Sequence, residues 1–182
     1  MKLLIGSSLF LSLMSCSAQM SESKKNTQVD FNGSFEVFED GLPVNWLVYT
    51  SKTVKTGDFS ISSDANEFKL GKQSLRFDIK NCSAAGGRFS PGIAQEIPVK
   101  SGETYTVSFW AKNTGSDFVC TIAGINSFAR GSTTSLKSNN NSGEWTYYTA
   151  QYQIPEKMDQ LRIELNILQG GTVWLDGIEI KP

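Results

Sequence analysis

The chain has 182 residues, a length typical of a single domain, with 17 basic and 18 acidic side chains and a formal net charge of −1. This balance provides no excess of positive charge, so the composition does not indicate binding to nucleic acid. The chain contains no histidine, which excludes Ser-His-Asp and Cys-His catalysis, histidine zinc sites and the usual general base near neutral pH.

The N-terminal segment has the features of a secretory signal, because one basic residue precedes an apolar run over residues 3–14. This run is shorter than the roughly 20 apolar residues that span a bilayer. Residues 13–16 resemble a bacterial lipobox, in which the cysteine after the cleavage site carries the lipid. We therefore expect a signal peptide over residues 1–15, lipidation at Cys16, and anchoring to a membrane of the bacterial cell envelope, at the outer membrane or on the periplasmic side. The alternative is an ordinary signal cleaved near Ala18, which also directs the chain out of the cytoplasm.

A polar segment and then a series of short strands are expected after the cleavage site. Residues 16–28 are rich in Ser and Lys and have no apolar period, which predicts a flexible tether. The folded domain is expected over residues 29–182. Within it, apolar and polar residues alternate as they do in strands with one buried face. The clearest such segments are 73–80, 104–112, 146–154, 160–168 and 172–180, and further strands are expected near 35–38, 45–50, 57–62, 92–99 and 118–125.

The spacing of these segments predicts the fold class. Turn-forming pairs such as those at 40–41 and 170–171 separate them, and no segment has a sustained helical period. Many short strands at regular spacing predict an all-β, two-sheet sandwich. The hydrophilic stretch 126–143 predicts a long surface loop.

Two cysteines lie within the expected domain, Cys82 and Cys120. In an oxidising compartment they could form a disulfide, which would stabilise the domain by about 4 kcal/mol. Both also lie in apolar-patterned strands, where free cysteines are often buried as thiols. The sequence leaves the two possibilities open, and without a histidine partner it does not indicate a metal or catalytic role for either cysteine.

A series of short motifs extends over residues 32–180. In chain order these motifs are Asn-Gly-Ser-Phe-Glu (32–36), Leu-Pro-Val-Asn-Trp (42–46), Gly-Lys-Gln-Ser-Leu-Arg (71–76), Ala-Gln-Glu-Ile-Pro-Val (94–99), the strand 102–112, Gly-Glu-Trp (143–145), Gln-Ile-Pro (153–155) and Val-Trp-Leu-Asp-Gly-Ile-Glu-Ile (173–180). In this order and spacing they resemble carbohydrate-binding modules of the family 4/9/16 type, within the galactose-binding-like β-jelly rolls. The resemblance implies a jelly roll that captures a poly- or oligosaccharide without cleaving it, with envelope glycan-processing proteins as further partners.

The same resemblance implies a structural calcium ion between the first and last strands. The matching carboxylates are Glu36 and Asp176, and backbone carbonyls near Gly33 and Lys72 would complete the ligand set. Calcium prefers about six to eight oxygen ligands, which such a set can approach. The alternative is that the two carboxylates belong to turns or strand edges and hold no metal.

The resemblance also implies that the sugar lies on the concave outer side of one sheet. There, aromatic rings stack on sugar C–H groups, and amide and charged side chains bind hydroxyl groups. Trp110 fits this role because it lies opposite the apolar side of its strand. The other candidates are on polar sides of strands or at strand ends: Gln95, Asn166, Gln151, Arg88 and Trp46. Trp46 also fits a core residue, and each glutamine also fits a solvated strand position.

A catalytic function is the less favoured possibility. A glycosidase would need two carboxylates on one face, and Glu164 with Glu96 or Glu144 is the best available combination. No Glu-x-Asp-x-x-Glu motif is present, and no strand carries two glutamates on one face. A polysaccharide lyase could use Tyr148 or Tyr152, but both lie on the apolar side of their strand.

A third possibility is an adhesion or assembly module that binds protein through its loops. Phe128 and Arg130, which follow Asn126, would be its natural anchors, because aromatic and arginine side chains dominate interface energetics.

Overall fold

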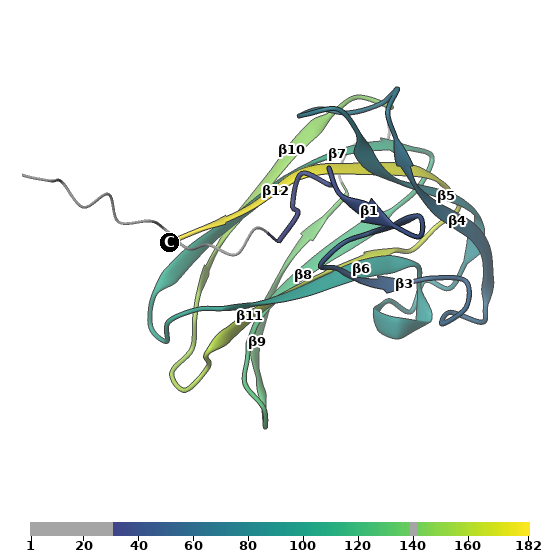
Figure 1. The fold of residues 1–182 in the computed structure, drawn as a ribbon. Helices are drawn as coiled ribbons and strands as arrows, with labels where there is room; N and C mark the ends of the chain where they lie inside the picture. The colour runs from purple at the N-terminus through teal and green to yellow at the C-terminus, as the bar shows by residue number, and fades with distance from the viewer. Residues whose placement is uncertain (1–30, 139–141) are drawn as a thin grey trace, which may run out of the picture.

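The computed structural model describes residues 31–138 and 142–182, which form two five-stranded antiparallel sheets packed face to face (Figure 1). The β7 sheet has the order β10 (Thr146–Gln153), β7 (Thr104–Thr114), β12 (Gly171–Lys181), β5 (Ser74–Cys82), β4 (Gly57–Asp64). The β11 sheet has the order β3 (Leu47–Tyr49), β6 (Gly92–Pro98), β11 (Gln160–Ile167), β8 (Phe118–Ile125), β9 (Arg130–Lys137). The short strands β1 (Phe38–Glu39) and β2 (Leu42–Pro43) form a separate pair.

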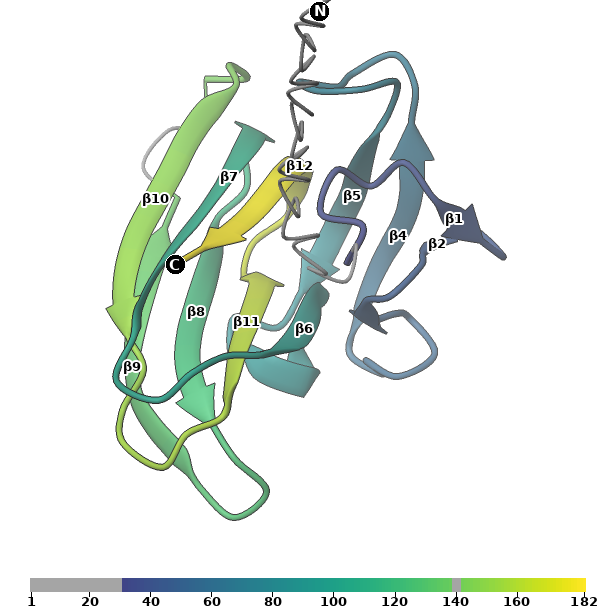
Figure 2. The ribbon, with the colours of Figure 1, turned by 60° about the vertical axis from the view of Figure 1, so that its left-hand side comes forward.

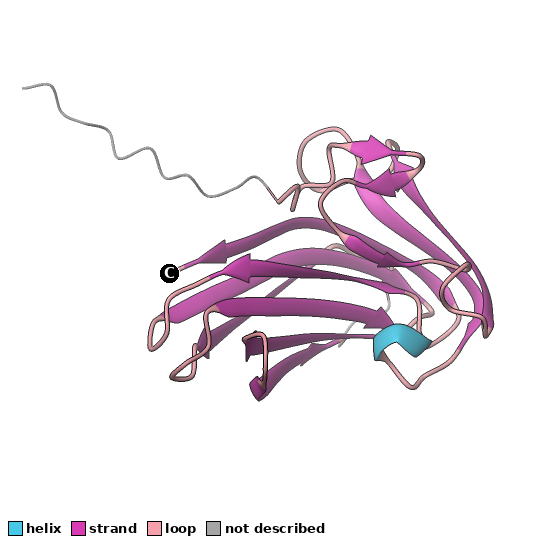
Figure 3. Ribbon diagram, turned by 60° about the horizontal axis from the view of Figure 1, so that its bottom comes forward, coloured by secondary structure: helices cyan, strands magenta, loops and turns pink. Residues whose placement is uncertain are grey.

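The chain passes repeatedly from one sheet to the other, as in a jelly roll. From β3 onward it changes sheet at every connection except those between β4 and β5 and between β8 and β9. Figure 2 shows β10, β7, β12, β5 and β4 across one layer. In the described part of the chain the helical structure is one 3-10 turn, η1 (Gly87–Phe89), between β5 and β6 (Figure 3). The prediction of an all-β, two-sheet sandwich is confirmed.

Alternate side chains of both sheets form one shared core. Phe109 of β7 and Phe118 of β8 are almost fully buried, and their rings lie 6.1 Å apart at an angle of 60°. Tyr148 of β10 stacks on Phe109 at 5.2 Å and meets Phe118 edge-on. Because burial of apolar surface is the dominant stabilising contribution to folding, these contacts hold the two sheets together.

The prediction of a surface loop over 126–143 is wrong for part of that stretch. Arg130–Lys137 forms β9, which pairs along β8. It is an edge strand, and only its inward positions need to be apolar or half-buried, as Thr134 and Leu136 are. Its serines and threonines therefore fit a strand that water covers on one side, even though the segment has little hydrophobic periodicity.

The two cysteines lie in different sheets and are free thiols. Cys82 ends β5, whereas Cys120 is buried in β8. Burial raises the pKa of the Cys120 thiol to about 12 and also raises the pKa of Cys82. Thiols of this kind are unreactive at neutral pH, because the thiolate is the nucleophile.

Within residues 31–138 and 142–182, no helix is long and apolar enough to cross a membrane.

Candidate polysaccharide-binding face

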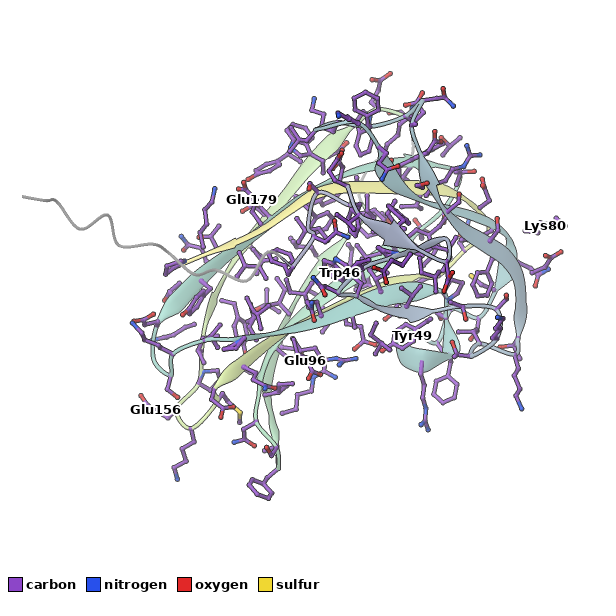
Figure 4. The ribbon with its side chains drawn as sticks, in the orientation of Figure 1. Trp46, Tyr49, Lys80, Glu96, Glu156 and Glu179 are labelled. Carbon is purple, nitrogen blue, oxygen red and sulfur yellow. The ribbon has the colours of Figure 1, made fainter. Side chains whose placement is uncertain are left out.

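The outer side of the β11 sheet carries a group of polar side chains. The register places Glu164 of β11 beside Ala94 of β6 and Thr121 of β8, on the side away from the core. Arg162, two residues earlier, lies on the same side because side chains alternate along a strand. We define the polar face as the outward side chains of this sheet and of the adjoining turn η1: Tyr49, Arg88, Phe89, Glu96, Arg130, Arg162 and Glu164. Figure 4 shows Tyr49 and Glu96 along this side of the sheet and Trp46 between the sheets.

Glu164 lies at the centre of the polar face and is only 7% exposed. The Tyr49 hydroxyl donates a hydrogen bond to Glu164 Oε1 (2.9 Å), and Arg162 Nε donates one to Glu164 Oε2 (3.1 Å). Because a buried carboxylate is costly unless it is paired and hydrogen-bonded, these contacts explain how Glu164 is accommodated under the surface. Burial, followed by the hydrogen bond to Glu164, raises the pKa of Tyr49, so this hydroxyl remains a proton donor.

Arg162 connects Glu164 with the exposed edge of the sheet. Besides the bond to Glu164, it donates to Glu96 Oε1 (2.5 Å) and to the Tyr49 hydroxyl (2.9 Å). Burial acts to lower the pKa of Arg162, but the hydrogen bonds to Glu96 and Glu164 outweigh it and raise the pKa. The guanidinium is thus fixed in place by partners from three strands.

Asn166 positions the turn that borders the polar face. Its side-chain amide donates to the Gly87 carbonyl and accepts from the Gly87 N–H, both at 2.9 Å. The next two residues, Arg88 and Phe89, are exposed, with the guanidinium of Arg88 5.3 Å from the Phe89 ring centroid. Phe89 is 56% exposed and follows Gly87 by two residues, at the border of the polar network.

Two predicted ligand-binding residues do not point to this surface. Trp46 is 8% exposed and packs against Phe31 and Phe35, so its indole is part of the core. Gln95 is opposite Ile163 and therefore on the core side of its strand, where its amide binds the Asn45 carbonyl. Neither side chain offers a free group to a ligand on the polar face.

Trp110 and Gln151 lie on the other sheet. Trp110 of β7 points outward, but Lys69 Nζ lies 4.2 Å from its ring centroid and the Tyr147 ring 5.0 Å from it. Gln151 is exposed on edge strand β10. The residues predicted to share one concave face are therefore distributed over two sheets, and only Asn166 and Arg88 belong to the surroundings of the polar face.

Sequence reasoning did not assign Tyr49, Arg162 or Phe89 to a binding site. One signal was available: Arg162 and Glu164 are two residues apart on the polar side of a strand, so their side chains are neighbours. Tyr49 could not be found in this way, because it is 115 positions from Glu164 in the sequence.

Two of the three carboxylates considered for catalysis are already engaged. Glu164 is held by Tyr49 and Arg162, and Glu96 is held by Arg162. Glu144 precedes β10 in the opposite sheet. Tyr148 and Tyr152 are buried, as their place on the apolar side of the strand predicts.

The predicted calcium ligands were compared with the donors that the structure presents. Asp176 is fully buried, and its Oδ2 accepts hydrogen bonds from the Lys69 and Leu70 N–H groups (2.7 and 2.8 Å). Its Oδ1 has no hydrogen-bond partner. Glu36 approaches from the other side of the same loop, where its Oε1 accepts from the Lys72 N–H (2.9 Å).

Burial raises the pKa of Asp176, and the nearby negative charge of Glu36 also acts to raise it. A buried carboxylate oxygen without a partner beside a second carboxylate is the environment that a cation would stabilise, so the donors fit calcium. The described residues contain no group of three or more His, Cys, Asp or Glu side chains arranged around a metal position, so backbone carbonyls would have to supply the remaining ligands.

Solved structures similar to this chain share its fold. A module of Clostridium thermocellum xylanase 10B, solved with xylohexaose, superposes with a TM-score of 0.59 at 20% identity over 82% of this chain and 28% of that chain. A CBM4 module gives 0.59 at 18% identity, over 83% of this chain and 97% of that chain. The active domain of bacteriophage CBA120 tailspike protein 4 gives 0.63 at 15% identity, over 82% of this chain. The fold is therefore the jelly roll of carbohydrate-binding modules, although this chain spans only 20% of the tailspike chain.

A family model then identifies the chain itself. The model for the family 4/9 carbohydrate binding domain matches residues 31–170, and the chain belongs to this family. It is a carbohydrate-binding module, as the sequence motifs predicted. No curated protein matches the chain at a significant level.

Proposed function

We propose that this module binds a poly- or oligosaccharide on the polar face without cleaving it. The observation that carries the proposal is the fixed network of Tyr49, Arg162 and Glu164 beside the exposed ring of Phe89. A sugar needs ordered polar groups for its hydroxyls and an apolar ring for its C–H face, and the polar face offers both. The non-catalytic part of the proposal is supported by Glu96 and Glu164, whose carboxylates are engaged in ion pairs and hydrogen bonds.

We further propose that the protein is a lipoprotein of a bacterial cell envelope, anchored through Cys16. This part rests on the N-terminal sequence, since residues 1–30 lie outside the described part of the chain. A single sugar site of this kind should bind with a Kd of about 10 µM to 1 mM. Many anchored copies that meet a repeating polymer would convert such weak sites into firm capture.

A structural calcium ion at Asp176 and Glu36 is the third part of the proposal. Both carboxylates would serve as ligands, with backbone carbonyls near Gly33 and Lys72. Calcium bound there would neutralise the buried negative charge of Asp176 and the partly exposed one of Glu36, and would tie the N-terminal loop to β12. Its contribution is to stability, because Asp176 lies in the β7 sheet and the polar face belongs to the β11 sheet.

The proposed binding face can be tested with a calorimetric binding screen against plant, host and microbial glycans in the presence of calcium. Phe89→Ala should weaken a detected interaction by about fivefold to tenfold, since it removes the stacking ring. Trp110→Ala is the matched aromatic control on the other sheet and should leave the affinity unchanged. If Trp110→Ala alone abolishes binding and the melting curve is unchanged, the ligand lies on the β7 sheet and the proposed face is wrong.

A further inference from the structure

The charges on the polar face do not balance, although the whole chain is nearly neutral. Glu96 and Glu164 provide two negative charges, whereas Arg88, Arg130 and Arg162 provide three positive charges. Lys137, at the end of β9, points to the same side, because it pairs with Val119 beside Asn166. The positive excess therefore lies on the surface that we propose for the sugar.

The three arginines differ in how far their hydrogen-bonding capacity is used. Arg162 donates to Glu96, Glu164 and Tyr49, which occupies its Nε and both terminal nitrogens. Arg130 has one ion-pair contact, from Nη2 to Glu164 Oε2 at 3.9 Å, which is too long for a hydrogen bond. Both oxygens of Glu164 already accept shorter bonds, so Arg130 has little to gain from this carboxylate.

Arg130 is also accessible from solvent. Its side chain is 45% exposed and lies on the edge strand β9. On the other side of Glu164 lies Gly87, and a Cβ atom at this position would be 3.8 Å from Glu164 Oε1. Arg88 follows directly, and its exposed guanidinium lies 5.3 Å from the Phe89 ring centroid. One available guanidinium, from β9, thus lies beside the central carboxylate, and a second follows the η1 glycine that borders it.

We propose that the polar face selects polysaccharides that contain uronic acids, with Arg130 binding a sugar carboxylate. This inference rests on the proposed function. A guanidinium presents two parallel N–H donors that match the two oxygens of a carboxylate, and the resulting charge-assisted bonds are stronger than bonds to hydroxyls. Arg88 would attract the next acidic residue of the polymer, while Phe89 stacks on a sugar ring.

The test uses pairs of polymers in which the uronic acid carboxylate is either present or reduced to a neutral hydroxymethyl group. Polygalacturonate, alginate and hyaluronan are each compared with their carboxyl-reduced forms, and xylan and β-glucan serve as neutral polymers. The wild-type protein should bind at least one acidic polymer about tenfold more tightly than its reduced form, and added salt should weaken this binding. Arg130→Gln should remove about tenfold of the affinity for that polymer.

Two control variants separate direct contact from general charge. Arg130→Lys keeps the charge but loses the paired donors, and we expect it to recover only part of the affinity. Lys80→Gln removes one positive charge from β5 of the other sheet, where Lys80 is exposed, and should leave the affinity unchanged (Figure 4).

The outcomes also distinguish this inference from the proposed function. Suppose that a neutral polymer is bound, that Phe89→Ala weakens this binding and that Arg130→Gln does not. The sugar site is then supported, and the preference for uronic acids is overturned. The preference is also overturned if the wild type binds an acidic polymer and its carboxyl-reduced form equally well. It is overturned too if Arg130→Gln binds the acidic polymer as tightly as the wild type does. If no polymer of the panel is bound, both proposals fail.

Discussion

Replacement of Asp176 with asparagine should have opposite consequences in the absence and in the presence of calcium. Asp176 is fully buried, and its Oδ1 has no partner. Burial raises its pKa in the folded state above the usual 3.8. Without metal, its ionisation therefore removes stability as the pH rises through the folded-state pKa, and an uncharged asparagine avoids this loss. In chelator, we expect Asp176→Asn to be about as stable as the wild type at neutral pH, or more stable.

With calcium, the order of stability should reverse. A ligand that binds only the folded state stabilises it by about 2.7 kcal/mol when its concentration is about 100 times its Kd. For a domain of this size, 1 kcal/mol corresponds to a shift of about 2–4 °C in melting temperature, so the wild type should gain about 5–10 °C. Asp176→Asn should gain little, because it lacks the buried negative charge that calcium would neutralise.

Differential scanning calorimetry of both proteins, each in calcium and in chelator, measures this reversal directly. Asp40→Asn is the matched control in the exposed turn between β1 and β2, and its response to calcium should equal that of the wild type. A wild-type melting temperature that is identical in both conditions would refute the calcium site. An equal loss of stability for Asp176→Asn in calcium and in chelator would show that Asp176 acts only as an acceptor for the backbone of Lys69 and Leu70.

Three further predictions concern the core and the charged residues of the β7 sheet. Burial acts to raise the pKa of Asp64, but hydrogen bonds, first from Trp174, lower it from 3.8 to about 2. Because the folded-state pKa is depressed, Asp64→Asn should lower the free energy of unfolding in urea by about 2 kcal/mol at neutral pH. This difference between the variant and the wild type should vanish as the pH falls from about 4 to about 2. A difference in stability between Asp64→Asn and the wild type that does not depend on pH would contradict the lowered pKa of Asp64. Trp46→Ala should cost about 3–5 kcal/mol in the same assay, because it empties a core site between two aromatic rings, and a cost below about 1 kcal/mol would exclude a core role. A thiol reagent should leave Cys120 unmodified in the native protein and modify both Cys82 and Cys120 in urea. If neither Cys82 nor Cys120 is modified in urea, the two are joined by a disulfide.

The strands could be predicted from the sequence because a half-buried strand must repeat its apolar residues every second position. Phe118–Ile125 is observed with the expected bounds, and the expected inward residues of Gln160–Ile167 are buried. The strand Arg130–Lys137 was not predicted, because an edge strand needs few apolar residues. Burial periodicity is therefore informative for central strands and weak at the edges of a sheet.

The binding face was harder to predict because it depends on which strands become neighbours. Alternation correctly placed Trp110 and Asn166 on the outer sides of their strands, but it does not say to which sheet a strand belongs. Tyr49 meets Glu164 only because β3 and β11 both flank β6. Trp46 lies between a turn and β3, where local pattern does not determine the direction of a side chain. Gln95 lies within β6 on the same side as Ile93 and Ile97, so alternation could have placed it on the core side.

The measurement that tests the central claim most directly is the affinity of the wild type, Phe89→Ala and Trp110→Ala for the best-bound glycan, with a melting curve for each protein. If the sugar lies on the polar face, Phe89→Ala weakens binding by about fivefold to tenfold, Trp110→Ala binds as the wild type does, and all three proteins remain folded. If Phe89→Ala binds like the wild type and Trp110→Ala does not bind, the binding surface is the outer side of the β7 sheet, and the account given for the polar face is wrong.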